Sequence, residues 1–329
     1  MADDHRCGNQ NRKERVATEN THPSWIHGIL LRGIGGFYTA LTDNGEEYTL
    51  RCRKKFRHLG ISPLTGDEIL FTPGDGESNG WIEDILPRRS LCLRPPAANV
   101  TLLMIVAAPE PLPDLLLIDR LLSRAFGQNI HAVLVLNKAD LISSCPETDT
   151  MNPDPLPLEK LLYQDYAPAG IPVIPVSAAS KSNLDALIGQ MEGEITCFAG
   201  QSGVGKSTLL NALTGFQVAT GDLSARIARG KNTTRSAELF VKDNLRIMDS
   251  AGFSLLETEK ELPPDQLKNR YPEFLSFEGK CRFRGCLHDR EPGCAVREAV
   301  QNGLVSSGRF ERYHILLREL IENWNHRYD

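Results

Sequence analysis

The sequence predicts three parts in order along the chain: a small β-barrel, an α/β unit with a parallel sheet, and a C-terminal helical segment. Short alternating runs broken by glycines and by the hairpin signal Asp43-Asn44-Gly45 indicate the barrel, at residues 23–96. Apolar strand patterns alternate with helical patterns over residues 97–260, as in a parallel sheet. Strand patterns then stop, and residues 261–329 contain a cluster of cysteines with a histidine.

Length and composition restrict the class of protein. The 329 residues suffice for two or three domains, and 41% hydrophobic residues suffice for their cores. A formal net charge of −5 argues against a chain that coats nucleic acid, so any RNA binding would be local. Residues 1–22 lack a signal-peptide core and are expected to form a flexible tail. No apolar run reaches the roughly 20 residues of a membrane span, so we expect a cytoplasmic protein without a membrane segment.

In the barrel region, alternating runs such as Gly36–Leu41 and Glu47–Leu50 favour an OB fold. A basic segment that contains one phenylalanine follows Glu47–Leu50 directly. Strands and loops of this kind commonly bind RNA in OB barrels, whereas the alternative is an edge strand that its charges protect from pairing. The candidate RNA-binding residues are Arg51, Arg53, Lys54, Lys55, Phe56 and Arg57.

The central part has a regular order of predicted strands and helices. The predicted strands are Thr101–Val106, Ala132–Leu136, Val173–Val176, Ile195–Ala199 and Arg246–Met248. The predicted helices include Pro113–Ala125, Asn183–Met191 and Lys206–Leu213, and a further one near the C-terminus, Arg309–Trp324. The stretch from Cys145 to Pro157 is rich in proline and aspartate and indicates a surface loop.

A glycine-rich segment joins a predicted strand to a predicted helix. It reads Gly200-Gln201-Ser202-Gly203-Val204-Gly205-Lys206-Ser207, the pattern of a phosphate-binding loop. In such loops, backbone N–H groups and the helix N-terminus bind phosphate oxygens. Lys206 would reach the β- and γ-phosphates, the Ser207 hydroxyl would ligate Mg²⁺, and Thr208 would lie beside the α-phosphate.

A second motif, Asn137-Lys138-Ala139-Asp140, follows another buried-strand pattern and indicates guanine recognition. The Asp140 carboxylate can accept two hydrogen bonds from guanine, and adenine offers no such pair of donors. Lys138 would lie over the base, and Asn137 would tie neighbouring loops together. Ser177-Ala178, after a third strand, fits a backbone contact to the guanine carbonyl.

Further candidate catalytic residues lie beyond the phosphate loop. Asp249 ends the last predicted strand and would hold Mg²⁺ through water, and the Gly252 amide would sense the γ-phosphate. Thr233 or Thr234 could supply a second hydroxyl to magnesium.

The C-terminal cluster consists of Cys281, Cys286, His288 and Cys294. Three thiolates and an imidazole favour tetrahedral zinc, and four protein ligands make a closed, structural site. Zinc would replace a core that so short a segment cannot build. The alternatives are unrelated buried cysteines, or a redox pair, although no Cys-x-x-Cys is present.

The order of the two nucleotide motifs is unusual. In ordinary GTPases the phosphate loop precedes the guanine motif, and here it follows that motif by about sixty residues. Because both motifs are complete, the sequence predicts a circularly permuted α/β P-loop GTPase. An N-terminal OB-type β-barrel and a C-terminal zinc-binding helical domain would flank it.

Over about residues 25–325 the chain resembles the circularly permuted GTPases of small ribosomal subunit biogenesis, the RsgA/YjeQ family. Besides the nucleotide and Cys/His motifs, the resemblance rests on Arg53–Arg57, Arg94-Pro95-Pro96 and Asp119-Arg120-Leu121-Leu122. It implies a GTP hydrolase that uses Mg²⁺ and one structural zinc ion and is stimulated by the small subunit. It also implies binding to ribosomal RNA late in assembly, followed by release. We expect a monomer that binds GTP and GDP.

Two positions depart from the family pattern. The family usually carries Asp-Thr-Pro-Gly-Phe, where this chain has Ala251 in place of the proline, which frees a backbone torsion. The family also usually has a histidine that helps to position the attacking water, where this chain has Asn232. Asparagine cannot take up a proton near neutral pH, so we expect slow basal hydrolysis with nucleotide binding retained. The alternatives are a GTP-gated RNA-binding switch with little hydrolysis, and a regulatory GTPase with a non-ribosomal partner.

Overall fold

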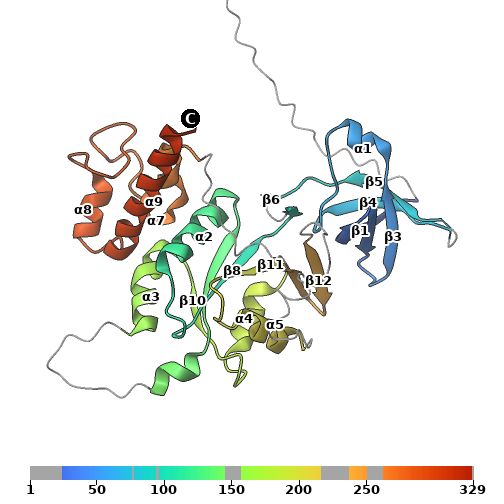
Figure 1. Cartoon of the computed structure of the whole chain (residues 1–329), viewed down its shortest axis with the longest axis horizontal. Helices are drawn as coiled ribbons and strands as arrows, with labels where there is room; N and C mark the ends of the chain where they lie inside the picture. Colours follow the sequence, from blue (N-terminus) through green and yellow to red (C-terminus); the bar gives the residue numbers. More distant parts are fainter. Residues whose placement is uncertain are drawn as a thin grey trace, which may run out of the picture.

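The computed structural model places a barrel at one end, a mixed sheet in the middle and a group of helices at the other end (Figure 1). The structure describes residues 24–75, 78–93, 96–144, 157–215, 237–249 and 262–327. Among these residues, no helix combines the length and the apolar character needed to cross a membrane. Several predicted features lie outside the described residues: the tail 1–22, the Arg94-Pro95 junction, most of the Cys145–Pro157 loop, and Asn232, Thr233, Thr234, Ala251 and Gly252.

The N-terminal part is a closed barrel of five strands in the order β1-β2-β3-β5-β4, as the alternating pattern predicts. Inward-facing side chains such as Leu30, Leu50 and Phe71 fill it. β3 and β5 pair in parallel, and the other pairs are antiparallel. Its elements are β1 (Ile26–Ile34), β2 (Phe37–Leu41), β3 (Glu47–Cys52), α1 (Lys54–His58), β4 (Glu68–Thr72) and β5 (Gly80–Ile85).

The basic segment is not a single strand. β3 ends at Cys52, and α1 begins at Lys54. Phe56 is buried in the barrel core, because α1 turns its ring toward the interior. The expectation that Phe56 contacts RNA is therefore corrected: its ring packs inside the barrel and offers no face for a base.

The barrel is fixed to the edge of the central sheet. Thr65 Oγ1 donates a hydrogen bond to the Ala237 carbonyl at 2.9 Å, and Arg32 pairs with Glu238 at 3.1 Å. Gly66 has φ +87°, and a Cβ on it would lie 2.2 Å from the Ala98 carbonyl oxygen, so only glycine permits this close approach. A short ribbon of β6 (Leu91–Leu93) and β7 (Pro96–Ala98) connects the two parts.

The central part is a six-stranded sheet in the order β10-β9-β8-β11-β13-β12. β12 is antiparallel to β13, and the other neighbouring pairs are parallel. The predicted strands match five of these strands to within one residue at each end, whereas the edge strand β12 is not predicted. The strands are β8 (Leu102–Ala107), β9 (His131–Leu136), β10 (Val173–Pro175), β11 (Ile195–Ala199), β12 (Glu238–Lys242) and β13 (Leu245–Asp249).

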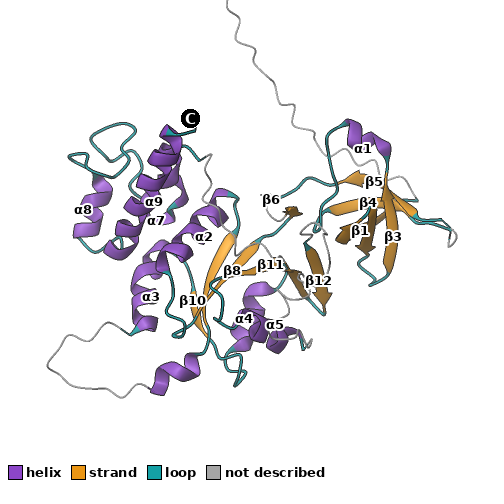
Figure 2. Cartoon of the chain, in the orientation of Figure 1, coloured by secondary structure: helices purple, strands orange, loops and turns teal. Residues whose placement is uncertain are grey.

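Helices cover both faces of this sheet, which explains why every residue of β8 is buried (Figure 2). Leu103 and Ile105 face α2 (Leu115–Gly127) and α3 (Leu158–Tyr166). Met104 and Val106 face the opposite layer. That layer consists of α4 (Leu184–Met191) and α5 (Lys206–Thr214), and two short 3-10 helices, η1 (Ala139–Ser144) and η2 (Ala167–Ala169), lie in the loops.

The C-terminal part is helical and has its own core around Tyr271, Phe274 and Tyr313. Its long helix α9 packs beside α2 of the central part. Buried ion pairs from α9 to Asp119 on α2 strengthen this contact. The elements are η3 (Pro264–Arg270), α7 (Pro272–Leu275), α8 (Ala295–Gln301) and α9 (Ser307–Asn325).

Candidate functional site

The predicted nucleotide motifs follow strands of the central sheet that run in the same direction. Asn137 follows β9, Ser177 lies just beyond β10, Gly200 follows β11, and Asp249 ends β13. Because parallel strands end at the same edge, all of these positions lie at one edge of the sheet. Open α/β sheets bind their ligands at this edge.

The glycines of the phosphate-loop sequence hold a conformation that other residues rarely adopt. Gly200 has φ +133° and Gly205 has φ +90°. A Cβ at Gly200 would lie 2.2 Å from the Val106 carbonyl oxygen, and a Cβ at Gly205 would lie 2.5 Å from Asn137 Nδ2. The backbone thus turns tightly over β8 and enters α5 at Lys206, with N–H groups available to an anion.

Two lysine side chains lie across this loop. Lys206 Nζ donates to the carbonyls of Gly200 and Gln201 at 2.8 and 2.7 Å. Lys138 Nζ donates to the carbonyls of Glu110 and Gly203 at 2.6 and 3.0 Å. Burial lowers the pKa of Lys206, because a cation there has lost part of its hydration. Both ammonium groups therefore lie against the backbone of the glycine-rich loop.

The Asn137 side chain joins two loops. Its Nδ2 donates to the Val204 carbonyl at 2.9 Å, and its Oδ1 accepts from the Ala178 N–H at 3.1 Å. One buried amide thus links the phosphate loop to the loop after β10. Ser177 is buried, and its hydroxyl accepts from the Ser180 N–H at 3.2 Å.

The remaining predicted residues of this site lie nearby in the chain. Ser202 and Gly203 are exposed at the turn of the loop, and Val204 is buried beneath it. Ser207 and Thr208 lie in the first turn of α5, while Ala139 and Asp140 begin η1. Asp249 is placed as the last residue of β13.

The sequence does not predict the segment between β8 and α2 as part of the site. Its Glu110 carbonyl accepts from Lys138, and the Asp114 N–H donates to Gln201 Oε1 at 3.2 Å. Asp114 also caps α2, since its carboxylate accepts from the Leu117 N–H at 3.0 Å. The proline-rich run from Pro109 to Pro113 is the signal that marks this loop.

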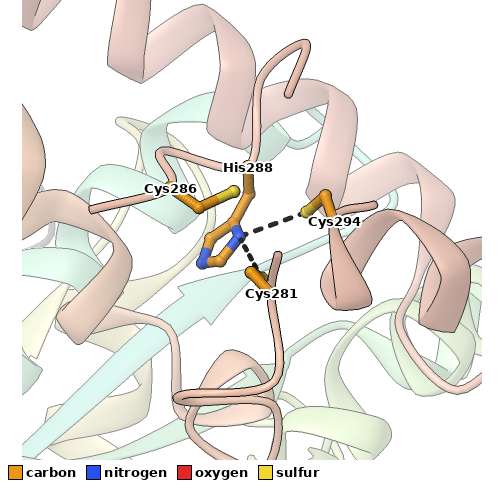
Figure 3. A group of neighbouring side chains, drawn as sticks. All are labelled: Cys281, Cys286, His288 and Cys294. Atoms are coloured by element: carbon orange, nitrogen blue, oxygen red, sulfur yellow. Dashed lines mark hydrogen bonds between the residues drawn. The ribbon is translucent and has the colours of Figure 1, made fainter. Parts of the chain in front are cut away.

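The four predicted metal ligands converge in the C-terminal part (Figure 3). Their donor atoms all lie within 4.8 Å of one another. His288 Nδ1 lies 3.3 Å from Cys294 Sγ and 3.7 Å from Cys281 Sγ. Tetrahedral Zn²⁺, with bonds of about 2.3 Å to sulfur and 2.05 Å to nitrogen, requires a nitrogen–sulfur separation of about 3.6 Å. The donor set and its spacing therefore fit such a metal ion.

The protonation chemistry of the cluster also fits a cation. Burial lowers the pKa of His288 to about 4, which leaves the imidazole neutral at pH 7, as a metal ligand must be. Burial raises the pKa of Cys286 to about 12, because desolvation disfavours the thiolate. Hydrogen bonds to Glu291 from the Leu287 and Asp289 N–H groups, at 2.7 and 2.9 Å, hold the loop around His288.

Comparison with known proteins identifies the family. The profile of the RsgA GTPase matches residues 85–259, and that of the RsgA N-terminal domain matches residues 27–82. The chain belongs to the RsgA family. It is therefore a GTPase, and the family implies a guanine nucleotide with Mg²⁺.

Relatives and solved structures cover nearly the whole chain. The "Small ribosomal subunit biogenesis GTPase RsgA" of Ruminiclostridium cellulolyticum is 41% identical over 298 residues, 89% of this chain and 93% of the relative. The protein of the same name from Geobacillus sp. is 38% identical over 297 residues, 90% of this chain and 97% of the relative. The structure of YjeQ from Thermotoga maritima superposes with a TM-score of 0.75 at 30% identity, covering 90% of this chain and 99% of that one.

A second solved structure bears on the order of the two nucleotide motifs. YloQ, described as a circularly permuted GTPase, superposes with a TM-score of 0.74 at 28% identity and covers 93% of this chain and 98% of its own. The predicted fold class, a permuted GTPase with a flanking barrel, is confirmed.

Proposed function

We propose that this chain hydrolyses GTP on the maturing small ribosomal subunit and that hydrolysis times a late assembly or release step. The observation that carries the proposal is the Asn137 side chain, which links the phosphate loop to the loop after β10 and so makes one site of separate motifs. The partner is inferred from the names of relatives that match nearly the whole chain. The protein would act as a monomer in the cytoplasm, where small subunits mature.

The nucleotide would be held from two sides. Asp140 would accept hydrogen bonds from guanine, and Lys138 would lie over the base. The backbone N–H groups of residues 200–205 would bind phosphate oxygens, and Lys206 would donate to the β- and γ-phosphates. Bound magnesium would neutralise charge that develops on the phosphates during transfer. Ser207 and Asp249 would hold that ion, and Thr233 or Thr234 could supply a second hydroxyl to it. The Gly252 amide would sense the γ-phosphate.

Each flanking part would have its own role. We assign residues 23–96 to RNA binding, 97–260 to GTP hydrolysis and 261–329 to a zinc domain in which Cys281, Cys286, His288 and Cys294 hold one structural Zn²⁺ ion. Exposed Arg51, Lys54 and Arg57 supply positive charge for ribosomal RNA. Arg53 and Lys55 are engaged with Glu83, so their contribution to RNA would be smaller.

GTP turnover of the purified protein tests the proposal. It would be measured alone, with small subunits and with large subunits at matched concentrations. Strong stimulation by small subunits only is the expected result. Tight GTP binding without stimulation would instead favour a non-hydrolysing switch or another partner. If Arg51→Ala/Arg57→Ala leaves association with small subunits unchanged, the barrel is not the RNA contact.

Asn232 stands where the family usually has a histidine, and this difference predicts slow GTP hydrolysis. Asn232→His should raise the single-turnover hydrolysis rate, because imidazole can accept a proton near neutral pH and asparagine cannot. GTP affinity should not change. A rate no faster than that of the wild type would contradict this role.

A further inference from the structure

The outer face of the barrel carries two aromatic side chains with an arginine between them. Strand register pairs Phe37 of β2 with Arg51 of β3, and pairs Arg51 with Trp81 of β5. Side chains of directly paired residues lie on the same face of a sheet, so all three point outward. Phe37 and Trp81 remain 40% and 39% exposed. We call these three residues the aromatic row.

Cation–π contacts hold the row in place. The Arg51 guanidinium carbon lies 4.7 Å from the centre of the Phe37 ring, and that of Arg53 lies 5.5 Å from the centre of the Trp81 ring. Arg53 Nε donates to Glu83 at 2.7 Å, which orients its guanidinium. The exposed rings are therefore positioned before any ligand arrives, which lowers the entropy cost of binding.

The surroundings of the row are basic. Lys54 and Arg57 are exposed on α1, which follows β3 directly, and Arg51 lies inside the row. Neighbouring strands lie about 4.8 Å apart, so Phe37 and Trp81, two strands apart, are separated by about 10 Å. A single strand whose bases are unstacked and splayed outward can place separate bases on these two rings. A duplex buries its bases in pairs and would not present them to these rings.

We propose that Phe37, Arg51 and Trp81 form a stacking platform for unpaired bases of RNA. The proposal rests on the RNA-binding role of the barrel proposed above, and it specifies the form of RNA and the side chains that contact bases. Stacking on aromatic rings tolerates any sequence, because every base presents a π-face. Basic residues beside the row contact phosphates, and the rings select single-stranded segments.

The test uses the full-length protein and two labelled RNAs: an unstructured oligonucleotide of about 12 nucleotides, within the site size of OB folds, and a blunt duplex of the same length. Phe37→Ala and Trp81→Ala should each weaken binding of the unstructured RNA by about 5- to 150-fold, while leaving the salt dependence unchanged. Trp81→Phe should retain most of the affinity but lose the quenching of tryptophan fluorescence by RNA. Phe240→Ala removes a ring that is equally exposed, at 40%, on the central sheet, and should have no effect.

Variants that remove positive charge distinguish the stacking platform from the general RNA binding proposed for the barrel. Lys54→Ala/Arg57→Ala should weaken binding of both RNAs and reduce the salt dependence. If this double variant weakens binding while both ring variants bind as the wild type does, the stacking platform is wrong and the barrel's RNA binding stands. If the wild type prefers the duplex, the platform is also wrong. If neither RNA nor small subunits bind at all, the proposed function itself fails.

Discussion

Replacing Arg309 by methionine should loosen the C-terminal helices from the central sheet. Arg309 on α9 is 1% exposed, and it donates to Asp119 of α2 at 2.7 Å and to Glu273 of α7 at 2.6 Å. Its guanidinium also lies over the rings of Tyr166 and Tyr271, at 5.1 and 4.9 Å. A methionine keeps an unbranched apolar stem in this position but leaves the two carboxylates without the cation.

The loss of stability depends on which of the two carboxylates is left without a positively charged partner. Asp119 keeps a second guanidinium, that of Arg312. Glu273 loses Arg309, and within the described part of the chain its Oε2 already has no hydrogen-bond partner. Removing one partner of a buried ion pair typically costs about 3–5 kcal/mol, because the remaining charge stays desolvated. Arg309→Met/Glu273→Leu should recover much of that loss, since both charges are then absent.

Amide hydrogen exchange along α9 measures this effect locally. A cost of about 3–5 kcal/mol corresponds to a roughly 100- to 4000-fold larger opening constant for α9. Arg120→Ala is the matched control, because Arg120 pairs with Glu319 across the same two helices at 2.6 Å but with 22% and 33% of the side chains exposed. That pair should contribute about 1 kcal/mol or less. If Arg309→Met increases exchange no more than Arg120→Ala, the reasoning from burial is refuted.

Three further predictions concern the nucleotide site and the metal centre. Asp140→Asn should lower the affinity for GTP by about 10²- to 10⁴-fold, because two charge-assisted hydrogen bonds to guanine are lost, and the affinity for ATP should not change. A competition assay in which both nucleotides lose affinity equally would contradict guanine recognition by Asp140. Gly205→Ala should weaken GTP binding by at least about tenfold, because φ is +90° and the new Cβ would displace Asn137. Gly189→Ala, on α4 with nothing within 4 Å, is its control and should stabilise the helix by about 1 kcal/mol in a denaturant titration. Burial raises the pKa of Cys286 to about 12, so metal binding must expel its thiol proton, and the affinity of the protein for zinc should fall at least about tenfold per pH unit on acidification. Competition with a chromophoric chelator measures this affinity. A protein affinity that stays constant from about pH 8 to 6 would disprove the prediction.

Local sequence predicts the strands and the chemistry that follows them. The glycines from Gly200 to Gly205 and the four residues from Asn137 depend on backbone conformations set by their near neighbours, and parallel strands bring their loops to one edge. The Cys/His cluster is similarly local, because its four residues lie within one short segment. Helix α3 and strand β12 of the central part are not predicted from the sequence.

Residue type and periodicity by themselves determined that this chain is a permuted GTPase with a barrel and a candidate metal cluster. Only the tertiary structure decided which side chains meet across those parts. Phe56 is drawn into the barrel because a helix follows β3, and strand register brings Phe37 and Trp81 to either side of Arg51. Arg309 meets Asp119 across 190 positions of sequence. Such pairings depend on how elements pack, and a local pattern carries no information about the direction in which a distant element will approach.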